Sequence, residues 1–158
     1  MSAILEIENK IYDTFAEVAS SLGYSPLHGK IIGVLLVSGK ALSLDDVAKE
    51  TGYSPSMVSL SLDLLEVLGI IKKVKKTGDR KLYLELHGDL LEALKNAIII
   101  KLEKSVRNSL TEFEKAKEQL KAIDGDNKNK VLKTISVLEG NIKRLEMYVN
   151  LLAEIQLP

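Results

Sequence analysis

LSLDDVAKETGYSPSMVSLSLDLLEVLGIIKKVKKTGDRKLYLEL, residues 42–86, is the stretch of sequence that decides the fold. Ser43 is a suitable N-cap for a short helix, and Gly52 is a suitable residue to end it because a tight turn favours a positive φ. Ser54 is the corresponding cap of a second helix, which Gly69 ends. The stretch therefore predicts two short helices joined by a tight turn, which is the arrangement of a helix-turn-helix.

The second of these helices is predicted to have one face in the core and one face available to a partner. Val58, Leu62 and Leu65 repeat at helical spacing and define the core face. Hydroxyl groups on the other face can bond base edges, and apolar tips can touch a thymine methyl. The helix carries no Arg or Lys, so the expected base readout is modest or favours A·T. Taken alone, the helical pair could also be a plain core element. The outward positions are Ser56, Met57, Ser59, Leu60 and Asp63, and the cap Ser54 is a further candidate for DNA contact.

The segment that follows predicts a β-hairpin with a basic tip. Apolar β-favouring residues flank it over residues 70–74 and 82–86, and Gly78 with Asp79 supplies the turn. Asp79 is the single acid among six bases. Such an excess of positive charge favours binding to DNA, because each phosphate that a basic side chain neutralises releases condensed counterions. A run of charge can be only a solvated face, but its position after a helix-turn-helix favours DNA binding. The six bases are Lys72, Lys73, Lys75, Lys76, Arg80 and Lys81.

The run from Ser25 to Leu86 resembles the winged helix-turn-helix regulators of the MarR type, and within them most closely the GbsR-type branch. The similar segments are the SPLHGKIIGVLL opening, the LSLDDVA helix, the VSLSLDLLEVLG helix and the GDRKLY hairpin. The resemblance implies a dimeric transcriptional regulator, commonly a repressor, that a small ligand often releases. It also implies that Arg80 enters the minor groove and that Ser56, Met57, Ser59 and Leu60 face the major groove. Leu60 stands where the broader family often has a basic residue.

We therefore predict a mainly α fold, a winged helix of the α+β kind, that binds double-stranded DNA through the helix Ser54–Leu68. A homodimer would present two such helices to an inverted-repeat operator. The alternative is a winged-helix protein-interaction module or adaptor without DNA binding. Lys30 and Lys49 are expected to add contacts to the DNA backbone. The residues expected to grip phosphates or the minor groove are Lys75, Lys76, Arg80 and Lys81.

The remaining helices suggest how the chain is organised. Residues 1–24 form a helix for dimerisation or core support, with an apolar stripe, and residues 25–87 form the DNA-binding domain. Residues 88–158 are predicted to form an antiparallel helical hairpin for dimerisation, because their last helix keeps a heptad seam. The alternative is an intramolecular bundle against residues 3–22. The seam consists of Val131, Ile135, Leu138, Ile142, Leu145, Val149 and Leu152.

Composition excludes several classes of function. The 158 residues contain 22 Lys plus Arg, 22 Asp plus Glu and no Cys, which rules out disulfides, thiolate metal sites and cysteine redox chemistry. No apolar run approaches the length needed to span a bilayer, so the sequence predicts a soluble, cytoplasmic protein. It contains no HExxH motif and no glycine-rich phosphate loop. We accordingly expect no enzyme activity, no cofactor and no metal.

A small-molecule effector is the last expectation. By the resemblance, its site would lie between the dimerisation helices and the winged helix. The aromatic residues Tyr12, Phe15, Tyr24 and Tyr53 could wall such a site, for example around a cation. The alternative, which the sequence favours, is that they are ordinary core and rim residues.

Overall fold

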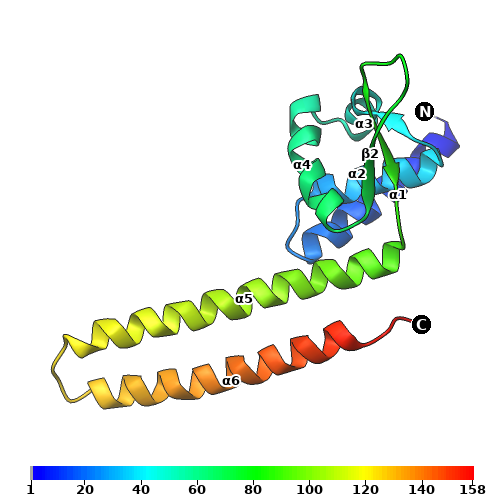
Figure 1. The fold of residues 1–158 in the computed structure, drawn as a ribbon. Helices are drawn as coiled ribbons and strands as arrows, with labels where there is room; N and C mark the ends of the chain where they lie inside the picture. The colour runs from blue at the N-terminus through cyan, green and yellow to red at the C-terminus, as the bar shows by residue number, and fades with distance from the viewer. Residues whose placement is uncertain (1) are drawn as a thin grey trace. The chain divides into compact units, whose positions relative to one another are not determined.

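The computed structural model describes residues 2–158 as a mainly helical chain with one small sheet (Figure 1), which confirms the predicted fold class. The chain divides into two compact units, the first ending at Ala97 and the second running from Ile98 to Pro158. The elements are α1 (Ala3–Ser21), α2 (Pro26–Ser38), β1 (Leu42–Ser43), α3 (Leu44–Thr51), α4 (Pro55–Val67), β2 (Ile71–Lys75), β3 (Leu82–Leu86), α5 (Leu90–Lys121) and α6 (Lys128–Glu154).

Serine caps begin the helices of the winged helix where the sequence predicts them. The Ser43 hydroxyl accepts from the Asp46 N–H at 3.1 Å, and the Ser54 hydroxyl accepts from the Met57 N–H at 3.2 Å. At the start of α2, His28 completes a capping box, because its Nδ1 accepts from the Ser25 backbone N–H at 3.2 Å. His28 is therefore a helix-terminal hydrogen-bonding residue.

The sheet has the strand order β1-β3-β2, and both pairings are antiparallel. β2 and β3 pair from Ile71 opposite Leu86 to Lys75 opposite Leu82, and with the loop of residues 76–81 they form the wing. The short strand β1 was not predicted. It places Ser43 opposite Tyr83, so Ser43 is both the cap of α3 and part of the sheet.

The core of the first unit lies between α2, α3, α4 and the sheet. The α4 residues predicted to point inward, Val58, Leu62 and Leu65, are fully buried. Burial of this apolar surface is the main contribution to stability, at about 25 cal/mol per Å². The other large, fully buried side chains of this unit are Leu27, Ile31, Val34, Leu35, Val47, Ile71 and Leu84.

Helix α1 contacts α2 through a narrower strip than its apolar pattern suggests. Tyr12 and Ala16 are buried, whereas Ile4 and Ile7 remain 70% and 57% exposed in the single chain. The two helices meet at Gly29 of α2, where there is no room for a side chain. A Cβ at this position would lie only 2.0 Å from the Phe15 carbonyl oxygen of α1. Gly29 therefore permits a close approach of the two helix backbones.

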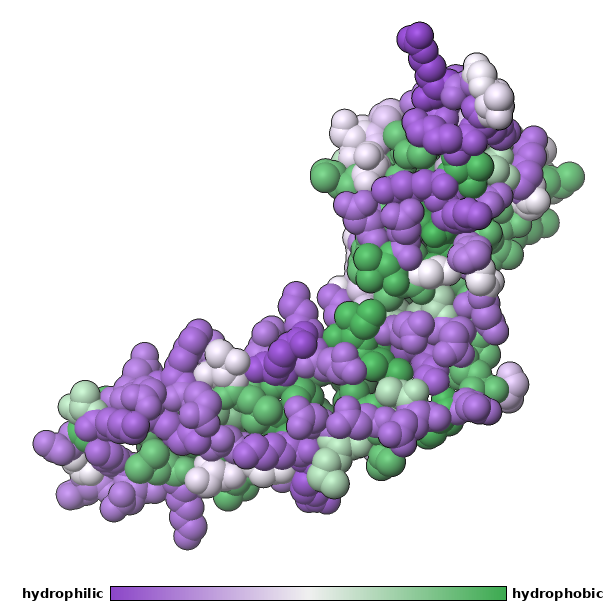
Figure 2. Space-filling model, in the orientation of Figure 1, coloured by the Kyte–Doolittle hydropathy of each residue, from purple (hydrophilic) through white to green (hydrophobic). Residues whose placement is uncertain are grey.

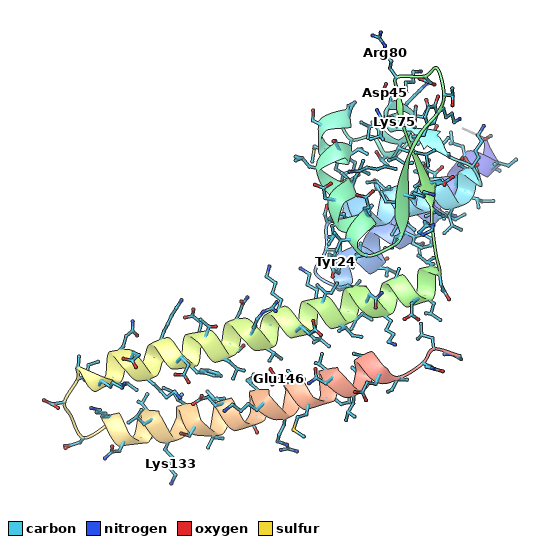
Figure 3. The ribbon with its side chains drawn as sticks, in the orientation of Figure 1. Tyr24, Asp45, Lys75, Arg80, Lys133 and Glu146 are labelled. Atoms are coloured by element: carbon cyan, nitrogen blue, oxygen red, sulfur yellow. The ribbon has the colours of Figure 1, made fainter. Side chains whose placement is uncertain are left out.

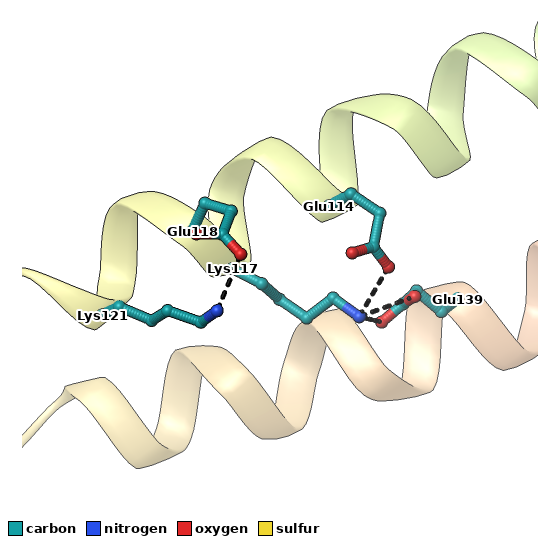
Figure 4. Close-up of polar contacts among 5 residues, drawn as sticks. All are labelled: Glu114, Lys117, Glu118, Lys121 and Glu139. Carbon is teal, nitrogen blue, oxygen red and sulfur yellow. Dashed lines mark hydrogen bonds and ion pairs between the residues drawn. The ribbon is translucent and has the colours of Figure 1, made fainter.

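In the second unit, α6 folds back along α5 as an antiparallel hairpin (Figure 1). The Lys117 Nζ joins the helices, lying 3.0 Å from an oxygen of Glu139 on α6 and 2.9 Å from one of Glu114 on α5 (Figure 4). These carboxylates, Glu114 first, raise the pKa of Lys117. Of the predicted seam, Ile135 and Val149 are buried, but hydrophobic side chains remain exposed along the hairpin (Figure 2).

Candidate nucleic-acid interface

The exposed face of α4 is the first part of the candidate interface. Leu60 is 82% exposed, and Ser56, Met57 and Ser59 are exposed around it. Ser61 faces inward instead, and its hydroxyl donates to the Met57 carbonyl at 3.1 Å. The structure thus brings the predicted outward residues together on one side of the helix. This side offers hydroxyl groups and apolar tips but no cationic side chain.

The wing tip is organised by its one acid. Asp79 Oδ1 accepts from the Lys81 backbone N–H at 2.9 Å, and Oδ2 accepts from the Tyr83 hydroxyl at 2.7 Å. Gly78, with φ of 76°, makes the tight turn possible. The Lys81 and Tyr83 hydrogen bonds lower the pKa of Asp79. Asp79 therefore shapes the loop, and both of its carboxylate oxygens accept hydrogen bonds from within the wing.

Cationic side chains surround this loop. Lys75, Lys76, Arg80 and Lys81 are all exposed. The Lys76 Nζ lies 3.9 Å from the centroid of the Tyr83 ring, which holds the ammonium group over the aromatic face. The Arg80 side chain extends outward from the tip of the wing (Figure 3). The four predicted wing cations thus form one basic projection.

Lys30 and Lys49 lie outside the wing, on the body of the first unit. The Lys30 side chain is 27% exposed, lies 3.9 Å from Asp13 and sits 5.7 Å from the Tyr53 ring centroid. Lys49, near the end of α3, is exposed and lines a groove with residues of α1 and α2. Each residue therefore has neighbours from the body of the first unit, and their contact with phosphates stays a prediction.

Lys73 is a functional candidate that the sequence did not single out. Its Nζ lies 3.2 Å from Asp63 Oδ1 and 3.7 Å from Glu66 Oε1, both on α4. The hydrogen bond to Asp63, ahead of the other effects, raises the pKa of Lys73. In the sequence Lys73 is one base in a run of bases, and only the packing of β2 on α4 distinguishes it.

The first unit also contains an apolar cavity of about 240 Å³. Its lining comes mostly from α1, α2, α4 and the first turns of α5, and the side chains with aromatic rings are Phe15, Tyr24 and His28. The Tyr24 hydroxyl donates to the Ala97 carbonyl at 2.7 Å, and burial raises the pKa of Tyr24. Tyr12 and Tyr53 do not line this cavity, so the four aromatics considered together in the sequence do not form a single wall.

The described part of the chain has neither a metal-binding cluster nor a membrane-spanning helix. Across residues 2–158, no three His, Cys, Asp or Glu residues are grouped so that they could hold a metal ion. Across the same residues, no helix combines the length and the apolar character needed to cross a bilayer.

Comparison with known proteins supports this reading of the fold. The HTH-type transcriptional repressor GbsR of Bacillus subtilis (strain 168) is 25% identical over 146 residues, which cover 89% of this chain and 81% of that protein. A crystal structure of a transcriptional regulator has the same fold, with a TM-score of 0.56 and 15% identity over 94% of this chain and 99% of that chain. No family model matches the chain. The resemblance predicted from the sequence is confirmed.

Proposed function

We propose that this chain, a homologue of a GbsR-type repressor, is a DNA-binding transcriptional regulator that acts as a homodimeric repressor on an inverted-repeat operator. The observation that carries the proposal is the wing tip. Its only acid, Asp79, is bonded inside the loop and is outnumbered by Lys75, Lys76, Arg80 and Lys81, so the tip keeps a net positive charge. The proposal assigns the chain no enzymatic role, and its chromosomal target implies a cytoplasmic location.

We assign the DNA contacts to side chains that are exposed or partly exposed in the structure. The helix Ser54–Leu68 enters the major groove, where Ser56, Met57, Ser59 and Leu60 meet base edges and thymine methyl groups. The Ser54 hydroxyl accepts from the Met57 N–H and keeps its own proton for a phosphate. The wing grips phosphates or the minor groove, and Lys30 and Lys49 add backbone contacts. The wing residues in these contacts are Lys75, Lys76, Arg80 and Lys81.

Dimerisation is proposed from the apolar surface that a single chain leaves in water. Ile4 and Ile7 on α1 are mostly exposed, and the hairpin exposes further large hydrophobic residues. Burying such surfaces against a second copy is favourable, and two-fold symmetry would place two recognition helices about one DNA turn apart. We assign this role to residues 1–24 and 88–158, and DNA binding to residues 25–87. The exposed residues of the hairpin include Val137, Leu138, Met147, Tyr148 and Leu151.

The apolar cavity is the proposed effector site. Its lining has no carboxylate, so it suits an uncharged apolar molecule better than a cation. A thermal-shift series with neutral and cationic compounds of matched size tests this class of ligand. Stabilisation by the neutral compounds is the expected result, and stabilisation by the cations alone would contradict it.

A gel-shift experiment with genomic fragments at several salt concentrations tests DNA binding. Affinity should fall steeply with salt, because binding releases counterions from the phosphates. Removing two wing contacts in Lys76→Ala/Arg80→Ala should reduce the magnitude of the salt slope by about two. Lys115→Ala, which removes a charge from the hairpin, is the matched control and should leave the slope unchanged. Binding that does not respond to salt, or to the double substitution, counts against the proposal.

A protein-interaction module is the second candidate function. It is favoured by the outward face of α4, which carries no cationic side chain and on which Leu60 is 82% exposed. A pull-down with and without nuclease separates the two functions. A partner retained after nuclease treatment, together with no affinity for heparin, would favour the module. Loss of the co-purifying material on nuclease treatment would favour the regulator.

A further inference from the structure

The recognition helix α4 is itself acidic. Asp63 and Glu66 are its only charged residues, so the element proposed to enter the groove carries two negative charges. Asp63 lies largely in solvent, with 85% of its side chain exposed. DNA phosphates would repel both carboxylates, and this repulsion would oppose docking of the helix.

Lys73 of the wing contacts both of these acids. Its Nζ donates to Asp63 Oδ1 at 3.2 Å and lies 3.7 Å from Glu66 Oε1. Lys73 shares the face of β2 with Ile71, which is buried in the core that α4 helps to form. The pleat of the strand therefore directs Lys73 toward α4, and its side chain is only 33% exposed.

We propose that Lys73 is a positioning residue for DNA binding: it masks Asp63 and Glu66 from the phosphates and ties the wing to the recognition helix. This inference rests on the proposed function. Exposed ion pairs contribute little to folding, so the effect of Lys73 appears in DNA affinity and not in stability. Lys73 differs in this from the cations of the wing tip, which face the solvent and have no acid of α4 beside them.

The test measures affinity of the full chain for a random-sequence duplex at several salt concentrations. Lys73→Met should weaken binding by about threefold to tenfold, because two carboxylates a few ångströms from the phosphates become unmasked. The loss should shrink as salt rises, because salt screens the repulsion, although no phosphate contact is removed. Asp63→Asn/Glu66→Gln added to Lys73→Met should restore the affinity of the wild type. Circular dichroism melts should be the same for all variants.

Lys115→Met is the control, because Lys115 forms a similar exposed pair, 3.1 Å from Glu112, on the hairpin; it should bind as the wild type does. Wild-type affinity of Lys73→Met overturns the inference. A triple variant that stays weak, with a salt slope reduced by about one, also overturns it and makes Lys73 a phosphate contact. A wild-type protein that binds no duplex at low salt removes the proposed function, and the inference with it.

Discussion

Replacing Gly29 with alanine should force α1 and α2 apart. The new Cβ would lie 2.0 Å from the Phe15 carbonyl oxygen and 2.6 Å from the Ala16 amide nitrogen. Both are backbone atoms, so no side chain can rotate to relieve the contact. Ordinary contact begins at 3.4 Å, so the two helices would have to separate locally by about 1.4 Å (3.4 − 2.0).

Two opposing effects set the magnitude. Alanine is better than glycine inside a helix by about 0.5–1 kcal/mol. Overpacking costs about 1–3 kcal/mol, and the upper end applies here because the obstacle is backbone. The expected net loss of unfolding free energy is about 2 kcal/mol, which corresponds to a fall in Tm of about 4–8 °C for a chain of this size. DNA binding should fall with it, because α2 is the central helix of the first unit.

Thermal and urea unfolding followed by circular dichroism measure this effect. Gly140→Ala in α6 is the control: its Cβ would meet no atom within 4 Å, so it should stabilise its helix by about 0.5–1 kcal/mol. Gly33→Ala should fall between the two, since its Cβ would lie 3.2 Å from Tyr12 Cα. If Gly29→Ala proved as stable as the wild type, the close approach of α1 and α2 would be refuted.

Three further predictions concern the wing, the dimer and base readout. The Tyr83 hydroxyl helps to lower the pKa of Asp79, so the wing tip should stay ordered as pH falls through the ordinary Asp range and loosen only below it. Tyr83→Phe should raise the pH at which the NMR signals of the loop change, and an unchanged titration would contradict this. Ile4→Glu/Ile7→Glu should preserve the fold and weaken the dimer in sedimentation experiments, because unpaired charges would be buried; an unaltered dimer would exclude α1 from the interface. Leu60→Ala should reduce affinity for an A·T-rich site by about fivefold or more, with a smaller effect on a G·C-rich site; equal losses on both would argue against a thymine contact.

Local signals made much of the fold predictable. The serine caps at Ser43 and Ser54 and the positive φ of Gly52 depend on contacts within a few residues, which a sequence displays directly. The inward face of α4 was also predictable, because helical spacing alone places Val58 and Leu62 together.

Contacts between distant residues were not predictable in the same way. The pairing of Lys73 with α4 depends on how β2 packs, and Lys30 contacts Asp13 of α1 and the Tyr53 ring. The apolar stripe predicted for α1 included Ile4, which is exposed in the single chain, and left out Tyr12, which is buried there. Periodicity reports which residues avoid water, but it does not report whether the covering surface belongs to the same chain.

The double role of Ser43 links the wing to the helix-turn-helix. Its hydroxyl caps α3 through the Asp46 N–H, while its backbone is paired with Tyr83 of β3. Fraying of the sheet at this point would also release the first turn of α3. The first part of β3 and this helix should therefore open together as one cooperative segment, with amide protons that exchange at matching rates.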